Sequence, residues 1–135
     1  MTHQAVVDES PFMSFLAPQI RDWQEDQIEI ALQARPEFCN RSGVLHGGVI
    51  AAILDHVGGM CGLYSDDPER QRHCVTLNLN VNYVGQAKDG LLIATGQRIR
   101  GGRKIFFARM QLTTESGDIL ATGTGVFRYR SGSET

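Results

Sequence analysis

The chain has 135 residues, with 41% apolar residues, 15 glycines and 4 prolines, which is the composition of a globular protein rich in glycine. This length is typical of one domain with one core, so we expect a single domain over residues 1–135 and no separate catalytic and binding domains. The formal net charge of −2 gives no sign of a nucleic-acid-binding surface or a basic membrane patch. Glycine makes up 15 of 135 residues, about 11% against the usual ~7%, so we expect it at particular backbone positions.

From the sequence we expect neither an export signal nor a membrane-spanning segment. The start, Met1 to Gln4, is polar and lacks the basic and apolar regions of a signal peptide. Cys39, Cys61 and Cys74 are odd in number and form no CxxC pair, which favours free thiols in a reducing compartment. The longest apolar run, Val49 to Leu63, is shorter than the ~20 residues that span a bilayer. These patterns predict a cytoplasmic protein with no membrane partner.

The first half of the chain predicts a short helix, a strand, a loop and a long helix. Ser10 as N-cap, Pro11 behind it and Pro18 as a stop predict a helix over residues 10–18. The apolar alternation of Asp26 to Arg35 indicates a half-buried strand, and Pro36 to Leu45 has no period and forms a loop.

The segment from Gly47 to Tyr64 is apolar on nearly every side, which is typical of a buried helix. Gly58, Gly59 and Gly62 each disfavour a helix by up to ~1 kcal/mol relative to alanine. We therefore expect another part of the protein to pack very close to this backbone.

The second half of the chain predicts four strands. Cys74 to Tyr83 alternates, and the pattern predicts two faces: Val75, Leu77, Leu79, Val81 and Tyr83 on one, Thr76, Asn78, Asn80 and Asn82 on the other. The next three strands are Gly90 to Arg100, Arg103 to Glu115 and Asp118 to Tyr129, with turns at Gly101-Gly102 and Ser116-Gly117. These elements predict an α+β fold in which an antiparallel sheet wraps one central helix, followed by a frayed tail over residues 130–135.

The start of the long helix has the features of a site that stabilises an oxyanion. His46 precedes the helix, and the first backbone N–H groups belong to Gly47, Gly48 and Val49. Glycines let a carbonyl oxygen approach these donors, and the helix dipole favours negative charge there. The alternative is that the glycines only allow close packing of the helix on the sheet.

Asp55 is the only carboxylate in the apolar helix, and an isolated buried carboxylate is unfavourable. It is either a general base or nucleophile, or it contacts His56 or a backbone N–H in a purely structural role. Gly47 and Asp55 are eight residues apart, about 12 Å along one helix, so one carbonyl cannot contact both groups in one copy. If the two groups cooperate, we expect a two-fold dimer with two shared active sites.

Other catalytic chemistries fit the sequence poorly. A metal site made of His46, Asp55, His56 and Cys61 fails because these side chains project from different sides of a helix. No GxSxG elbow and no phosphate-binding glycine loop is present. Cys61 has no neighbouring cation in the sequence to activate it as a nucleophile. We therefore expect neither a metal nor any other cofactor.

Taken together, His46-Gly47-Gly48 before an apolar helix, an acid nine positions after the histidine, Asn40 six before it, and long strands after it resemble the hotdog-fold acyl-CoA thioesterases. The phenylacetate-degradation (PaaI-like) branch is the most similar, and the likeness covers about residues 26–129. The resemblance implies hydrolysis of an acyl-CoA, with CoA entering as part of the substrate, by a homodimer or a dimer of dimers.

The resemblance also implies roles for individual residues. The Gly47 N–H would polarise the thioester carbonyl, and Asp55 of the other subunit would attack it or activate water. Asn40 would position the water or the carbonyl, His46 would hold the loop, and Thr76 would lie near the acid. Further contacts with the substrate are implied for Gly48, Tyr83, Arg100, Gly102, Arg103 and Lys104. The last four match the turn that contacts the CoA nucleotide, although a solvated hairpin tip is the structural alternative.

Two other functions stay open. A hotdog hydratase or dehydratase pairs a catalytic histidine with an acid, but its Asp-His-His or His-Phe-Pro signatures are absent, and Asp55-His56 diverge by ~100° on a helix. A non-catalytic acyl-CoA-binding protein would lack a use for Asp55.

The sequence also departs from many family members at Gly58-Gly59, where they carry a small polar residue one turn after the acid.

Overall fold

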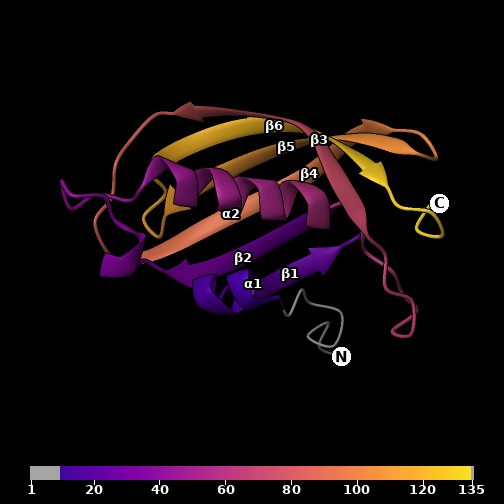
Figure 1. The fold of residues 1–135 in the computed structure, drawn as a ribbon, viewed down its shortest axis with the longest axis horizontal. Coiled ribbons are helices and arrows are strands. Elements are labelled where there is room, and N and C mark those ends of the chain that lie inside the picture. The colour runs from indigo at the N-terminus through magenta and orange to yellow at the C-terminus, as the bar shows by residue number, and fades with distance from the viewer. Residues whose placement is uncertain (1–9, 135) are drawn as a thin grey trace.

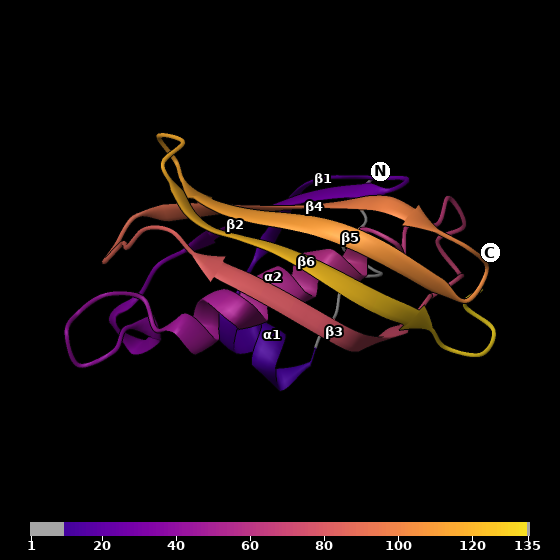
Figure 2. The ribbon, with the colours of Figure 1, turned by 90° about the horizontal axis from the view of Figure 1, so that it is seen from above.

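The structure is a computed structural model that describes residues 10–134, so the polar start at Met1 to Gln4 lies outside the described residues. The elements in chain order are α1 (Pro11–Leu16), β1 (Gln19–Gln24), β2 (Gln27–Gln33), the 3-10 helix η2 (Pro36–Phe38), α2 (Gly47–Met60), β3 (Cys74–Tyr83), β4 (Leu91–Gly101), β5 (Ile105–Thr114) and β6 (Ile119–Tyr129). The strands form one antiparallel sheet in the order β1-β2-β4-β5-β6-β3. The sheet curves around α2, and α1 lies on the β1–β2 side of α2 (Figure 1, Figure 2). The expected hotdog architecture is confirmed.

The long helix α2 buries one side against the sheet. Ile50, Ile53, Leu54 and Val57 are at most 3% exposed, and they meet the helix-facing side chains of the central strands. The opposite flank is only half-buried and carries Val49, Ala51, Ala52, Asp55 and His56. The expectation that α2 is buried on every side is therefore wrong for a single copy of the chain.

The glycines at the end of α2 allow the close packing that the sequence predicts. A Cβ at Gly58 would lie 2.7 Å from Cζ of Phe127, and a Cβ at Gly62 would overlap the Phe106 ring. These two rings are fully buried and stacked with centroids 5.2 Å apart. Glycine at both positions lets α2 and the residues after it rest directly on the aromatic layer of the sheet.

Strand β1 is absent from the sequence-based prediction. Its residues, Gln19–Gln24, pair with β2 at one edge of the sheet, and a register shift between Ile20 and Asp22 interrupts the alternation. Trp23 is its buried residue, at 5% exposed, and its Nε1 donates to the Met60 carbonyl 3.1 Å away. One large side chain fixes a strand that has no regular apolar pattern.

Strand β3 contains a β-bulge that changes which side chains face α2. The register of β3 with β6 shifts between Thr76 and Asn78, so Leu77 is the extra residue. Leu77 is 54% exposed, whereas Thr76 bonds to Asp55 of α2 and Tyr83 bonds to Gly47. The predicted grouping of Val75 and Leu77 with Leu79, Val81 and Tyr83 is therefore wrong, because the bulge reverses the alternation midway along the strand.

The two predicted turns have different outcomes. The turn at Ser116-Gly117 is confirmed, with Gly117 at a φ of 98° between β5 and β6. The first turn lies two residues later than predicted: Gly101 still pairs with Phe106, the Gly102 N–H donates to the Ile105 carbonyl at 2.9 Å, and Arg103-Lys104 form the tip.

The residues after β6 differ from the predicted frayed tail. Ser133 is 3% exposed, and its Oγ accepts a hydrogen bond from the His73 N–H at 2.8 Å. The Ser133 and Glu134 carbonyls accept bonds from the guanidinium groups of Arg72 and Arg70. Residues 130–134 are thus fastened to the loop that precedes β3.

Candidate active site

The backbone N–H groups at the start of α2 differ in whether the described part of the chain supplies them with an acceptor. His46 is the N-cap, with an extended ψ of 135°, and its Nδ1 accepts the Gly48 N–H at 2.8 Å. The His46 carbonyl accepts the N–H groups of Val49 and Ile50. Among residues 10–134, the Gly47 N–H has no acceptor. Of the predicted donors, the geometry therefore leaves the Gly47 N–H open to a ligand, at the positive end of the helix dipole.

Tyr83 lies directly beside this donor. Its hydroxyl donates to the Gly47 carbonyl at 2.7 Å, and a Cβ at Gly47 would approach Tyr83 Cε1 to 3.3 Å. The ring is 55% exposed, so its outer side is open to a ligand. The structure thus brings Tyr83 to the start of α2, while its predicted contact with substrate stays a prediction.

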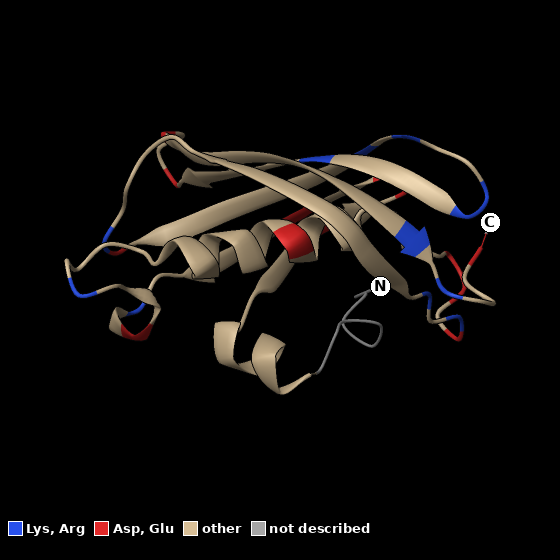
Figure 3. Cartoon of the chain, turned by 45° about the horizontal axis from the view of Figure 1, so that its top comes forward, with Lys and Arg blue, Asp and Glu red and all other residues tan. Residues whose placement is uncertain are grey.

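Asp55 has a hydrogen-bond partner on β3. Thr76 Oγ1 donates to Asp55 Oδ1 at 2.6 Å, a short bond of the kind formed between a hydroxyl and a carboxylate. Thr76 faces Asp55 because the bulge at Leu77 turns it toward α2. Asp55 is half-buried, and Figure 3 shows a single acidic segment along α2, which is Asp55 because that helix has no other carboxylate. The bond orients the carboxylate and leaves Oδ2 available for a water molecule or a carbonyl carbon.

Asn40 organises the loop before α2. Its Oδ1 accepts the N–H groups of Ser42, at 2.9 Å, and Val44, at 3.4 Å. The His46 N–H donates to the Phe38 carbonyl at 2.8 Å, which ties the end of this loop to η2. The structure therefore gives Asn40 a local role in shaping the approach to His46, and its predicted contact with water or a carbonyl stays a prediction.

The predicted cationic turn forms a separate group at the other end of the molecule. Arg100, Gly102, Arg103 and Lys104 are all exposed, and the β4–β5 hairpin and the start of α2 lie at opposite ends (Figure 1). A register shift between Arg98 and Arg100 pairs Arg100 with Phe107, whose side chain is on the outer face of the sheet. Lys and Arg gather at this end of the sheet (Figure 3). One copy of the chain therefore does not bring this turn together with Gly47.

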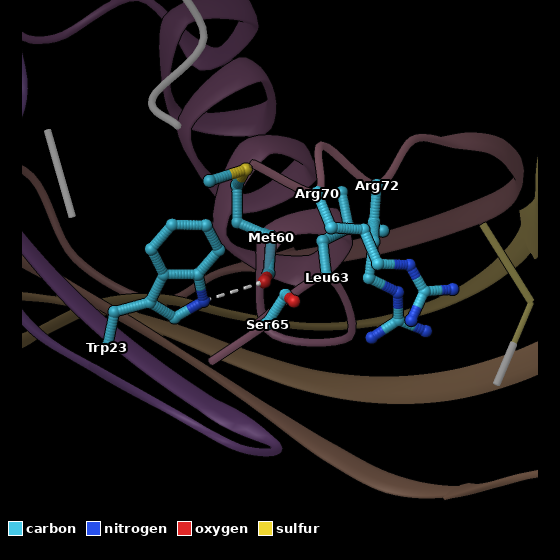
Figure 4. A pocket seen from close by; sticks show the side chains of 6 residues that line it. All are labelled: Trp23, Met60, Leu63, Ser65, Arg70 and Arg72. Carbon is cyan, nitrogen blue, oxygen red and sulfur yellow. Dashed lines mark hydrogen bonds between the residues drawn. The ribbon is translucent and has the colours of Figure 1, made fainter. Parts of the chain in front are cut away.

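A small pocket lies at the C-terminal end of α2 and contains none of the predicted site residues (Figure 4). It is lined by Trp23, Met60, Leu63, Ser65, Arg70 and Arg72. Trp23 and Met60 are joined by the indole hydrogen bond, and the backbone carbonyls of Tyr64 and Ser133 hold the Arg72 guanidinium. These contacts give the pocket a structural role in closing the end of the core.

Cys61 is unsuited to nucleophilic catalysis. Its side chain is fully buried, and Sγ donates to the Gly58 carbonyl at 3.0 Å. Burial raises the pKa of the Cys61 thiol to about 12, so the thiolate is scarce at neutral pH.

Within residues 10–134, no three His, Cys, Asp or Glu side chains are grouped as metal ligands. In the same part of the chain, no helix has the length and apolarity needed to cross a membrane.

Arg98 contacts the β4–β5 hairpin but is absent from the site residues predicted from the sequence. It follows Leu92, Ala94 and Gly96 along the side of β4 that faces α2. A cation at the end of such an apolar row is a signal that could have identified it.

Comparison with known proteins assigns the chain to a family. The family model described as the thioesterase superfamily matches residues 42–121, which is more than half of the chain. The chain therefore belongs to the thioesterase superfamily, and as an enzyme it falls in the class of thioester hydrolases. The predicted resemblance is confirmed at this level.

Individual relatives are similar over nearly the whole chain. The medium/long-chain acyl-CoA thioesterase YigI of Escherichia coli strain K12 is 27% identical over 130 residues, covering 87% of this chain and 84% of that protein. A solved phenylacetic acid degradation-related protein of Ralstonia eutropha JMP134 is 27% identical, with a TM-score of 0.78 and coverage of 90% and 92%. A conserved protein of Pseudomonas aeruginosa has the same fold, with a TM-score of 0.83 at 21% identity and coverage of 96% and 100%.

Proposed function

We propose that the protein hydrolyses the thioester of an acyl- or aryl-acyl-CoA to the free acid and CoA. The observation that carries this proposal is the pair of groups on α2: the Gly47 N–H at its start, which has no acceptor among residues 10–134, and the oriented Asp55 carboxylate in its middle. Similarity to an acyl-CoA thioesterase from Escherichia coli and to a phenylacetic acid degradation-related protein supports acyl-CoA as the substrate class.

In the proposed reaction the Gly47 N–H donates to the thioester carbonyl oxygen. Negative charge develops on that oxygen as the carbonyl carbon becomes tetrahedral, and the free N–H and the helix dipole stabilise it. The Gly48 N–H is bound to His46 Nδ1, so His46 fixes the start of the helix and Gly48 shapes the surface beside the substrate. Tyr83 holds Gly47 from the other side through its carbonyl.

The Asp55 carboxylate either activates the attacking water or attacks the thioester carbonyl carbon itself. As a general base it takes a proton from water while the water oxygen bonds to the carbonyl carbon; as a nucleophile its own oxygen bonds there and water hydrolyses the resulting anhydride. In both routes the carbon–sulfur bond breaks and CoA leaves as a thiolate that is then protonated. Thr76 keeps the carboxylate oriented, and the side-chain NH2 group of Asn40, whose Oδ1 accepts the Ser42 N–H, positions water or the carbonyl.

The two groups act together when two copies associate. Both lie on α2, eight residues or about 12 Å apart, so one thioester contacts Gly47 of one copy and Asp55 of the other. β3 is an edge strand, with Thr76 near one end and Tyr83 at the other. Antiparallel pairing of two β3 edges about a two-fold axis brings Tyr83 and Gly47 of one copy toward Thr76 and Asp55 of the second. The half-buried flank of α2 also supports a homodimer, or a dimer of dimers.

The β4–β5 hairpin supplies the proposed contacts with the CoA nucleotide. Arg103 and Lys104 form its tip, and Arg100 lies before them on the outer face of the sheet. The space beside Gly102 is open, since nothing lies within 4 Å of a Cβ at that position. Exposed guanidinium and ammonium groups are suited to phosphate oxygens.

The test is CoA thiol release from a panel of acyl-CoAs by the wild type and by Asp55→Ala. We expect hydrolysis of at least one acyl-CoA and a loss of about 100-fold or more in kcat for Asp55→Ala, with the acyl-CoA Kd little changed. Negligible hydrolysis by both proteins, with binding intact, would instead identify a non-catalytic acyl-CoA-binding protein. Fast hydrolysis that is unchanged in Asp55→Ala would contradict the proposed mechanism. Hydration of an enoyl-CoA without thiol release would favour a hotdog hydratase.

A further inference from the structure

The β4–β5 hairpin that carries Arg103 and Lys104 is held by Arg98, which lies on β4. Arg98 points to the same side of β4 as Leu92 and Ala94, both fully buried, and its own side chain is 19% exposed. The register shift after Arg98 turns Arg100 to the outer face of the sheet. Two arginines that are two residues apart therefore lie on opposite faces and have different surroundings.

The contacts of Arg98 join two turns of the sheet. Its Nη2 donates to the Gly102 carbonyl at 3.4 Å, and its Nη1 lies 3.9 Å from Asp26 Oδ1. The Arg98 backbone N–H donates to the Asp26 carbonyl at 2.8 Å. The β1–β2 turn thus anchors the guanidinium, and the guanidinium holds the hairpin.

The space that the guanidinium occupies depends on the absence of a side chain at Gly101. A Cβ at Gly101 would lie 2.7 Å from Arg98 Nη2 and 2.6 Å from Cβ of Phe106. Glycine at this position therefore lets Arg98 reach Gly102. The Gly102 N–H is bound to the Ile105 carbonyl at 2.9 Å, so both polar backbone groups of Gly102 are fixed immediately before the tip.

We propose that Arg98 is a positioning residue for substrate binding: by holding the Gly102 carbonyl, it sets the direction in which Arg103 and Lys104 present their charges to the CoA phosphates. This inference rests on the proposed function of the hairpin. Long cationic side chains at a turn lose much of their phosphate affinity when the backbone beneath them is free to move, because binding must then order that backbone.

The experiment compares a substrate that carries the nucleotide with one that lacks it. kcat and KM are measured for an acyl-CoA and for the same acyl group on pantetheine, in the wild type, Arg98→Met and Arg98→Lys, with Arg21→Met on exposed β1 as a matched control. We expect Arg98→Met to raise KM for acyl-CoA about fivefold to tenfold, with kcat and all acyl-pantetheine constants within about twofold of wild type. Arg98→Lys keeps a donor and should give a smaller rise, and Arg21→Met none.

A double variant, Arg103→Ala with Lys104→Ala, separates this inference from the proposed function. If the double variant raises KM for acyl-CoA and the Arg98 variants do not, the inference about Arg98 is wrong while the hairpin keeps its role. If the double variant also leaves KM unchanged, the hairpin does not bind the nucleotide and both statements fail. Equal losses for both substrates in Arg98→Met would give Arg98 a general structural role and overturn the proposal. Should Arg98→Met not fold, Arg98→Lys is judged by the same comparison.

Discussion

At the scale of single residues, two substitutions at Gly47 distinguish the effect of losing its backbone N–H from the effect of adding a side chain. Gly47 is the first residue of the helix, a position where proline is well tolerated, and the extended His46 before it has the backbone conformation that proline requires. Proline and alanine both add a Cβ near the Tyr83 ring, but only proline removes the N–H.

We predict that Gly47→Pro lowers kcat for acyl-CoA hydrolysis about 100-fold or more relative to Gly47→Ala, because one oxyanion donor is worth that much in related chemistry. Steady-state thiol release checks this, with thermal unfolding of both variants to compare their stability. Equal kcat values for two equally stable variants would contradict the assignment of the Gly47 N–H.

Cys61 gives a prediction for stability against pH. Burial raises its pKa from the ordinary 9.0 to about 12, and burial likewise raises the pKa of Cys74 to about 11. Above pH 9 the unfolded chain releases the Cys61 proton while the folded chain keeps it, so ionisation lowers the free energy of the unfolded state and makes unfolding more favourable. The contribution of the buried thiol is complete below pH 9 and declines as the pH rises toward 12.

We therefore expect the difference in free energy of unfolding between the wild type and Cys61→Ala to shrink as the pH rises above 9, by at most about 1.4 kcal/mol per pH unit. Urea titrations at several pH values from 8 to the highest at which folding is reversible measure this difference. A difference that stays constant over this range would show that the thiol ionises alike in both states.

At the scale of elements, the contact between the end of α2 and the sheet depends on the absence of side chains. The Gly62 carbonyl accepts the Tyr129 hydroxyl at 2.9 Å, and the Phe106 ring occupies the position of a Cβ at Gly62. Phe106 is stacked on Phe127 and packs against Tyr129 with the two rings tilted by 36°, and its side chain is fully buried.

Gly62→Ala should accordingly destabilise the fold by about 1–3 kcal/mol through overpacking. Gly102→Ala is the matched control, since nothing lies within 4 Å of a Cβ at that position. Denaturant unfolding of both variants gives the two free energies. A Gly62→Ala protein as stable as the control would mean that the aromatic layer yields more readily than its packing indicates.

The elements also show which parts of the fold the sequence can predict. Helix α2 and the strands β3 to β6 have continuous apolar periods, so their positions agree with the prediction to within about four residues at each end. β1 has only Ile20 and Trp23 as apolar residues and contains a register shift, so neither period is visible. The bulge at Leu77 is also hidden, because the letters alternate regularly through it while the backbone does not.

The candidate site likewise contains residues that the sequence can identify and contacts that it cannot. Gly47 and Asp55 are conspicuous in the sequence because glycines and a carboxylate interrupt an apolar helix. The contact of Thr76 with Asp55 depends on the bulge, and that of Tyr83 with Gly47 on the path of β3 across α2. Such contacts between distant segments leave no local pattern, so only the family resemblance pointed to Thr76.

At the scale of the whole molecule, the proposed catalytic groups Gly47 and Asp55 are only partly buried in a single copy of the chain. The half-buried flank of α2 and the exposed edge of β3, where Leu77 is 54% exposed, are adjacent to Asp55 and Gly47. Association of two copies along this edge would exclude water from the helix flank and build two equivalent sites, which a domain of this size cannot enclose alone.

The most direct test of this shared site is the initial rate of acyl-CoA hydrolysis by mixed dimers. Asp55→Ala and Gly47→Pro are each expected to be nearly inactive, and are unfolded together and refolded so that their subunits mix. A mixed dimer holds one site with both wild-type groups and one site with neither. Random mixing therefore predicts recovery to about one quarter of the wild-type rate per subunit. If each site is built within one copy, no mixed dimer has an intact site and the mixture stays as inactive as its two parents.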